Sequence, residues 1–437
     1  MQAGKILWQS ILWRGMYYVS AFIINILIAR HFQASVSGSI YYISNIYALV
    51  LLFSSLSLES GFIYFAARNE IPVSKLFNFS IVWSLFTGLI TFFVVYLFFA
   101  NAYQGISGTL MIVSSVSFIC GNLLTTYCSG FFYARNNFIV PNYINIICTI
   151  FLIVLIPYKG KSIIPAITNE NYFYIYFSSF LVQGVCLAIA AKLKYIKTGI
   201  QHFISLSEFR LLFRYCAMAF AGNIIYFLLY RVDYFFVEQY CTTEQLGNYI
   251  QVSKLGHLFF ILPVILASAV FPLTAGGQKE GINHLLSLLS RTIMFLYLIA
   301  CLILIVTGTW LFPFVFGESF SDMYLPFLLL IPGILAFSGL FTLTAYFAGK
   351  NQIKTNITGS VYALAIILTG DILFIPRYGI NAAALVSSIG YIVYQGYIII
   401  VFKKEFKTPL HQFYLIRFSD FKEIKKSVMS SIRKLPA

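Results

Sequence analysis

Three cationic side chains lie within long apolar stretches of this 437-residue chain: Arg231, Lys254 and His257. A charge among apolar residues is costly unless it has a partner or lines a water-filled cavity. Arginine binds phosphate through a fork of donors and lysine as a point charge. We therefore predict that the three form the wall of a cationic, phosphate-binding cavity. The alternative is an ion pair with Asp233 or Glu59, or an Arg231 side chain that extends to the membrane surface.

Other polar residues recur at helical spacing. In residues 248–257 they come in steps of three, along one slowly drifting face of a helix: Asn248, Gln251, Lys254 and His257. Near the N-terminus Arg14, Tyr18 and Asn25 also follow one another at helical spacing, although Arg14 also suits an anchor at the inner membrane boundary. We assign Gln251, Arg14 and Asn25 to the cavity with the cations. Tyr226 and Tyr230 are candidates to stack on sugar rings.

The acidic residues within apolar stretches are Glu59, Asp233 and Asp371. A carboxyl group inside a membrane protein can take up and release a proton, or bind a sodium ion. We interpret these three as candidates for ion coupling. Structural pairing with a nearby cation is the alternative for each.

The composition places these residues in a membrane protein. Residues of the AVILMFWYC set make up 60% of the chain and charged residues 10%, whereas a soluble chain has roughly 45–50% and about 25%. At roughly 20 residues per spanning helix, the length accommodates about a dozen spans. No soluble catalytic domain fits beside them.

Continuous rather than alternating apolarity predicts an all-α bundle of about twelve transmembrane helices. The apolar runs fall at 11–29, 39–66, 77–100, 106–134, 143–158, 172–191, 211–236, 248–275, 287–308, 323–348, 357–376 and 380–402. A cytoplasmic N-terminus places most of the 29 lysines and arginines inside, as the positive-inside rule requires. We therefore expect both termini in the cytoplasm.

Two alignments of the chain with itself indicate an internal repeat. Segment 29–45 aligns with 238–254, with Gly38 on Gly247, and segment 131–142 aligns with 345–356, with Asn137 on Asn351. Two six-helix lobes related by an axis along the membrane normal would place a substrate between them. The predicted parts are the N-terminal lobe 1–197, a cytoplasmic linker 198–210, the C-terminal lobe 211–402 and a basic cytoplasmic tail 403–437. The tail either lies on the anionic inner leaflet or is simply solvated.

The sequence lacks the motifs of nucleotide binding, metal binding, nucleophilic catalysis and nucleic-acid binding. Around Lys161 the first glycine of a P-loop would stand where Leu155 does, and the five histidines show no metal-binding spacing. No nucleophile with a base can be assembled, and a basic face for nucleic acid is missing. We expect no catalytic residues, no metal and no cofactor.

Three stretches resemble the polysaccharide transporter family, with the O-antigen flippases as the best match: 231–255, the pair Phe271-Pro272, and 375–389 (IPRYGINAAALVSSI). That family belongs to a larger superfamily with the multidrug extruders and the peptidoglycan-precursor flippase. The resemblance implies twelve helices in two lobes and alternating access. It also implies flipping of an undecaprenyl-pyrophosphate-linked oligosaccharide across the bacterial inner membrane, with Arg231 and Lys254 in the cationic cavity.

The partners expected on this interpretation are the lipid-linked substrate, H⁺ or Na⁺, membrane lipids and other polysaccharide assembly proteins. Twelve helices depart from the fourteen of the peptidoglycan-precursor flippases, which disfavours that substrate. A multidrug antiporter is the main alternative and would favour an acidic cavity. A membrane glycan polymerase or ligase is a further alternative, but these enzymes tend to need a large external loop, and the longest here is 157–172.

Overall fold

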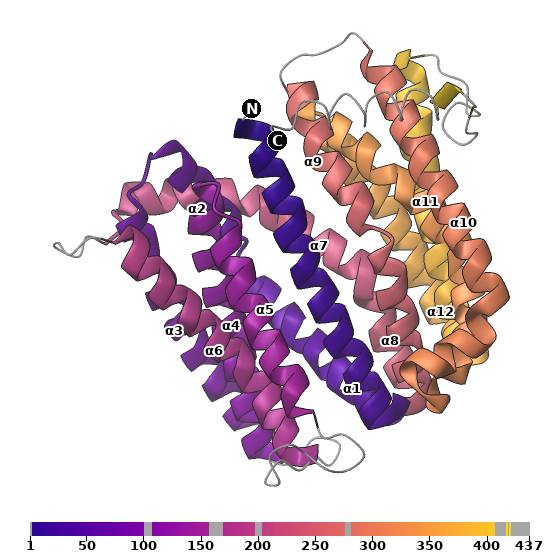
Figure 1. Ribbon diagram of the computed structural model, residues 1–437, viewed down its shortest axis with the longest axis horizontal. Coiled ribbons are helices and arrows are strands. Elements are labelled where there is room, and N and C mark those ends of the chain that lie inside the picture. The colour runs from indigo at the N-terminus through magenta and orange to yellow at the C-terminus, as the bar shows by residue number, and fades with distance from the viewer. Residues whose placement is uncertain are drawn as a thin grey trace, which may run out of the picture. The chain divides into compact units, whose positions relative to one another are not determined.

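The computed structural model describes residues 2–99, 107–156, 169–196, 203–275, 281–406, 417 and 419–420. All regular structure in these residues is helical, as the sequence predicted. The helices are α1 (Gln2–Ser55), α2 (Leu58–Arg68), α3 (Val73–Phe99), α4 (Gly108–Ala134), α5 (Ile139–Leu155), α6 (Asn169–Tyr195), α7 (Leu206–Tyr240), α8 (Thr243–Leu258), α9 (Ile261–Ala275), α10 (Ile282–Phe316), the 3₁₀ helix η1 (Glu318–Met323), α11 (Tyr324–Gly349) and α12 (Ile353–Phe406). Figure 1 shows them along the chain.

Nine helical stretches within the described residues are long and apolar enough to cross a membrane, and α5 is a shorter apolar helix of 17 residues. The protein is therefore a multi-pass membrane protein with an all-α fold. The number of twelve spans stays a prediction. Much of the predicted outer loop 157–172 and of the tail 403–437 lies outside the described residues.

Two helices are far too long for one crossing. α1 and α12 have 54 residues each, which at 1.5 Å per residue is roughly 80 Å, against about 30 Å of membrane hydrocarbon. Each is bent at one residue with positive φ, Gln33 (φ 60°) and Gly379 (φ 58°). The Tyr41 hydroxyl donates to the Asn25 carbonyl, 2.9 Å away, across the first bend. α1 is thus a helical hairpin.

α12 folds back on itself in the same way. A Cβ placed on Gly370 would lie 2.6 Å from Val386 Cγ1, and one on Gly390 would lie 2.6 Å from Ile367 Cγ1. These pairs come from opposite sides of Gly379, so the arms 353–378 and 380–406 run antiparallel. Small residues let the backbones of two membrane helices approach this closely.

The chain divides into two compact units. The N-terminal unit comprises residues 1–33 and 40–224, and the C-terminal unit comprises residues 34–39 and 225–437. α7 therefore belongs to the first unit up to Ile224 and to the second from Ile225. The lobe and linker boundaries expected from the sequence stay a prediction, and α7 begins at Leu206, inside the predicted linker.

Within the N-terminal unit, α4 packs most extensively on α6 and α3 (Figure 1). Gly121 of α4 and Gly184 of α6 permit this contact, because a Cβ on Gly121 would lie only 2.2 Å from the Phe180 carbonyl carbon. Aromatic rings fill the space around the glycines, with Phe118 and Phe180 4.8 Å apart at their centroids. In the core of this unit, glycines therefore allow the backbones of α4 and α6 to touch, and aromatic rings fill the space around them.

The expected span 39–66 is interrupted between α1 and α2. Leu56 and Ser57 have positive φ, and the break frees carbonyl groups that membrane hydrocarbon could not satisfy. The Trp83 indole donates to the Ser54 carbonyl (2.8 Å) and the Tyr127 hydroxyl to the Ser55 carbonyl (3.1 Å). Side chains of α3 and α4 thus stabilise a broken helix. The span 248–275 is broken too, between Leu258 and Ile261.

Candidate functional site

Two carboxyl groups are buried together in the C-terminal unit. Asp233 of α7 is 3% exposed and Asp371 of α12 is fully buried. Ser387 donates to Asp233, and Val386 beside it packs on Gly370, the residue before Asp371. Two carboxylates that share a buried site repel each other, so one proton or one cation stabilises the pair.

The two carboxyl groups differ in their hydrogen bonds. Asp233 accepts a short bond from the Tyr249 hydroxyl, a 3.2 Å bond from Ser387 Oγ and a 2.9 Å bond from the Tyr234 backbone N–H. Neither oxygen of Asp371 has a hydrogen-bond partner among the described residues. Asp233 therefore accepts three hydrogen bonds in its buried position, whereas Asp371 accepts none from the described residues.

The predicted cations lie in the same unit. Arg231 and Lys254 are half-buried, and the guanidinium of Arg231 lies 5.6 Å from the ring centre of Phe227. His257 lies 5.1 Å, ring to ring, from Tyr230, the residue before Arg231, and Lys254 lies one turn before His257 on α8. The structure thus places the three predicted cations on neighbouring parts of α7 and α8.

Helix α8 presents its predicted polar face in two parts. It begins with a capping box in which Thr242 and Gln245 each accept from the other's backbone N–H, at 3.2 Å. Asn248 and Gln251 are buried at 0% and 1% exposure, whereas Lys254 and His257 one to two turns later are partly exposed. The drift of a three-residue repeat around the helix accounts for the change.

Aromatic rings surround His257. Its ring lies 5.1 Å from that of Tyr230 and 5.7 Å from that of Phe260, and its Nε2 is buried without a hydrogen-bond partner among the described residues. Tyr226 and Tyr230 stack at 6.3 Å, and the Tyr226 hydroxyl is 3.3 Å from that of Tyr394. The two tyrosines expected to stack on sugars are held beside the cations.

Three predicted site residues belong to the N-terminal unit instead. Arg14 is exposed and stacks on Tyr133 and Phe138, 4.6 and 5.1 Å from their ring centres. Asn25 is half-buried, and its backbone carbonyl closes the α1 hairpin. Glu59 stands in the first turn of α2, directly after the break, and its buried Oε2 has no hydrogen-bond partner among the described residues.

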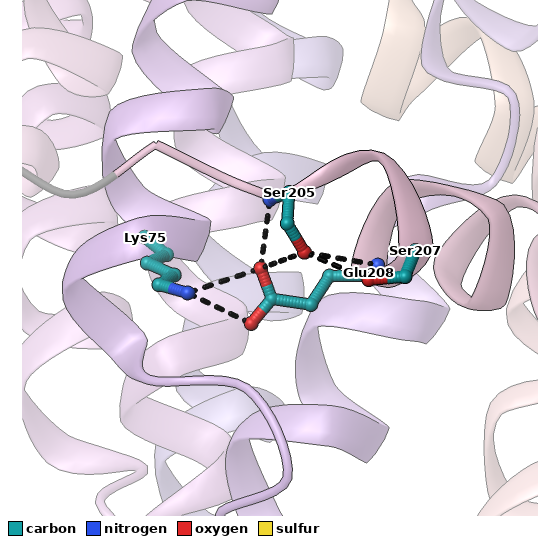
Figure 2. A network of polar contacts seen from close by, with 4 residues as sticks. All are labelled: Lys75, Ser205, Ser207 and Glu208. Atoms are coloured by element: carbon teal, nitrogen blue, oxygen red, sulfur yellow. Dashed lines mark hydrogen bonds and ion pairs between the residues drawn. The ribbon is translucent and has the colours of Figure 1, made fainter.

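The start of α7 is fixed by a polar network on the N-terminal unit, which Figure 2 shows. Glu208 Oε2 accepts from the Ser205 backbone N–H (2.8 Å) and hydroxyl (2.9 Å), and Lys75 Nζ lies 2.9 Å from Glu208 Oε1. The Glu208 backbone N–H donates in turn to Ser205 Oγ (3.3 Å). This capping box anchors α7 to the start of α3 through Lys75.

The sequence did not reveal two residues of the acid cluster. Tyr249 and Ser387 lie 16 and 154 residues from Asp233, and both donate to it. No spacing rule connects positions on three helices. A partial signal exists, because Tyr249 follows the buried Asn248 on the polar helix and Ser387 falls in the stretch 375–389 that carries the family resemblance.

The fold is that of multi-spanning helical transporters. It is similar to the lipid II flippase MurJ in an inward closed conformation, with a TM-score of 0.71 and 16% identity over 92% of this chain and 89% of that one. It is also similar to the Vibrio cholerae MATE transporter VcmN in the bent form, with a TM-score of 0.61 and 13% identity over 94% and 98% of the two chains. A MOP superfamily transporter from Pyrococcus furiosus, whose binding pocket has reverse polarity, aligns with a TM-score of 0.58 and 13% identity over 92% and 94%.

No curated protein matches the sequence. A family model described as polysaccharide biosynthesis protein matches residues 15–325, so the chain belongs to that family. The resemblance to the polysaccharide transporters is confirmed.

Proposed function

We propose that the protein is a flippase that moves an undecaprenyl-pyrophosphate-linked oligosaccharide, such as an O-antigen repeat unit, across the bacterial inner membrane by alternating access. Its family and its transporter fold support this proposal. The observation that carries it is that Arg231, Lys254 and His257 lie in the same unit as a buried acid pair, on neighbouring parts of α7 and α8. Such a site offers cations to a phosphate and carboxyls to a coupling ion.

In this proposal Arg231 and Lys254 bind the pyrophosphate, and Tyr226 and Tyr230 pack on the adjacent sugar. The pyrophosphate carries several negative charges, so two neighbouring cations that repel each other when empty are stabilised when it binds. Gln251 and His257 are assigned to the same site. Arg14 and Asn25 stay predicted contributors from the N-terminal unit.

The coupling ion, H⁺ or Na⁺, is assigned to Asp371 with Asp233 as its partner. Loading Asp371 removes the repulsion between the two carboxylates, and release restores it. Tyr249 and Ser387 keep Asp233 in place by donating hydrogen bonds to it. Because these residues come from α7, α8 and α12, ion binding favours one packing of the three helices over another. Glu59 stays a candidate for a second ion site.

The proposal includes the membrane arrangement expected from the charges, with both termini cytoplasmic and two six-helix lobes related by a repeat. Other polysaccharide assembly proteins are proposed as partners. The basic tail is proposed to lie near the anionic inner leaflet.

The proposal is tested by deleting the gene in its native host and complementing with wild type, Arg231→Ala or Lys254→Ala. We expect loss of surface glycan and accumulation of lipid-linked repeats at the inner leaflet, rescued by wild type and not by either variant. Lys354→Ala is a matched control, because Lys354 is an exposed cation at the start of α12. Unchanged surface glycan after deletion would contradict the proposal.

A multidrug antiporter is the second candidate, and the buried pair Asp233 and Asp371 favours it, because buried acids also suit cationic drugs. Charge reversal separates the two. Arg231→Glu should abolish glycan export in a flippase, and it should be tolerated or should increase resistance in a drug antiporter.

A further inference from the structure

A groove of about 390 Å³ runs between the two arms of α12 in the C-terminal unit. It is lined by residues of the first arm between Ala365 and Phe374, and by Val386 and Ile389 of the second. Of the lining residues only Thr369 has a polar side chain. Leu373, Phe374 and Ile389 are 57%, 47% and 43% exposed, so the groove opens outward from a helix of membrane length.

The groove has the length of one leaflet. Phe374 lies nine positions after Ala365, which at 1.5 Å per step is about 14 Å along the helix axis. The hydrocarbon of one leaflet is about 15 Å thick, half of the ~30 Å core. Phe374 is also close to the bend at Gly379, where the first arm ends. The groove therefore extends from the region of the bilayer centre to the interface at that bend.

A cationic side chain, Arg377, lies near the interfacial end of the groove. Ile366, Gly370, Leu373 and Arg377 follow at steps of four, three and four, so they share one face of the helix. Arg377 is exposed and lies about one turn beyond Phe374. Tyr378, which is 65% exposed, is an aromatic residue of the kind that lies at headgroup level. The apolar groove thus ends near the positive charge of Arg377.

We propose that this groove binds one anionic phospholipid, with an acyl chain along residues 365–374 and the phosphate at Arg377. An acyl chain of the adjoining leaflet is about as long as the groove. The undecaprenyl chain of the proposed substrate, in contrast, is several times longer than one leaflet is thick. The matching length and the charge together favour a membrane phospholipid as the occupant. The site does not depend on the proposed transport function.

The groove has structural consequences for the hairpin. Gly370 and Val386 form its floor, and the next residue on each arm, Asp371 or Ser387, belongs to the buried acid cluster. A chain in the groove would support the close contact between the arms at the level where that cluster is built. Bound phospholipid is therefore expected to stabilise the C-terminal unit.

The test measures binding of phosphatidylglycerol to the purified full-length protein in detergent by native mass spectrometry. Ala365→Trp fills the groove, and we expect it to weaken binding by more than about tenfold, because it displaces several methylenes from apolar contact. Arg377→Gln removes the charge and should weaken binding about fivefold. Lys354→Gln, at the other end of the same arm, is the matched control and should bind like wild type. All three positions are exposed, so folding is not at risk.

Competition identifies the occupant. Phosphatidylcholine should bind more weakly than phosphatidylglycerol in wild type and equally in Arg377→Gln. Unchanged phosphatidylglycerol binding in Ala365→Trp would overturn the proposal. Displacement of phosphatidylglycerol by undecaprenyl phosphate at equal concentration would also overturn it, since the groove would then accept the substrate's own tail.

Discussion

The same substitution, aspartate to asparagine, should have unequal effects on stability at the two members of the buried acid pair. Asp233 accepts three hydrogen bonds from Tyr249, Ser387 and the Tyr234 backbone. Asp371 is fully buried and has no hydrogen-bond partner among the described residues. An amide in place of the carboxylate therefore breaks existing hydrogen bonds only at Asp233.

The magnitudes follow from these contacts. An uncompensated buried charge costs several kcal/mol, whereas a neutral buried polar group without a partner costs about 1–3 kcal/mol. In sodium-free alkaline buffer, where no ion relieves the pair, Asp371→Asn should stabilise the protein by about 2 kcal/mol. Asp233→Asn relieves the same repulsion but leaves at least one donor unsatisfied, so it should be less stable than Asp371→Asn by about 1–3 kcal/mol.

Sodium provides the second measurement. A cation present at a hundred times its dissociation constant stabilises the folded state by about 2.7 kcal/mol, and we expect this gain, or the equivalent gain on acidification, only in wild type. Thermal unfolding of the purified protein is followed in sodium chloride and in N-methylglucamine chloride of equal ionic strength. Equal stabilities of the two variants would refute this prediction, as would a response of Asp371→Asn to sodium and protons like that of wild type.

Three further substitutions test the packing and the ion pairs by unfolding measurements. Gly121→Val should destabilise the protein by about 3 kcal/mol, because the new side chain meets the α6 backbone. The control Gly396→Val, at a site with open space, should cost no more than about 1 kcal/mol. Equal losses of stability in the two variants would contradict the packing of α4 on α6. Asp420→Asn should cost about 3 kcal/mol of stability, because buried Arg291 loses the carboxylate that accepts from its Nε at 2.9 Å and its Nη2 at 2.8 Å. A loss of stability below ~1 kcal/mol, typical of a surface ion pair, would show that the pair is not buried in solution. Glu208→Gln should cost about 1 kcal/mol of stability or less, because glutamine retains the capping box and only an ion pair of 22% exposed side chains is lost. A loss of stability above ~2 kcal/mol would mean that this ion pair anchors α7 more strongly than its exposure indicates.

The fold class could be predicted because composition and the continuity of the apolar runs together decide it. A chain with 60% apolar and 10% charged residues cannot coat a soluble domain, and continuous apolar runs favour helices over barrel strands. The bends were harder to predict. The loop expected between residues 29 and 39 is a single non-helical residue, Gln33, and nothing in its type indicates a left-handed conformation.

The candidate site was predicted in part for a physical reason. Charges in apolar runs stand out one by one, so Arg231, Lys254, Asp233 and Asp371 could be identified singly. Their hydrogen-bond partners are ordinary polar residues that become significant only through tertiary contact. The buried ion pair of Arg291 with Asp420 likewise could not be predicted, because 129 residues separate its two members.

The central claim is that this protein flips a lipid-linked oligosaccharide, and reconstitution tests it most directly. The purified protein is placed in vesicles that carry undecaprenyl-pyrophosphate-linked oligosaccharide in both leaflets, and an external glycosidase reports how much glycan reaches the outer leaflet. We predict that wild type exposes the glycan of both leaflets, that Arg231→Ala exposes little beyond the outer one, and that Lys354→Ala behaves as wild type. Glycan exposure equal to that of protein-free vesicles under every ion gradient would contradict the account.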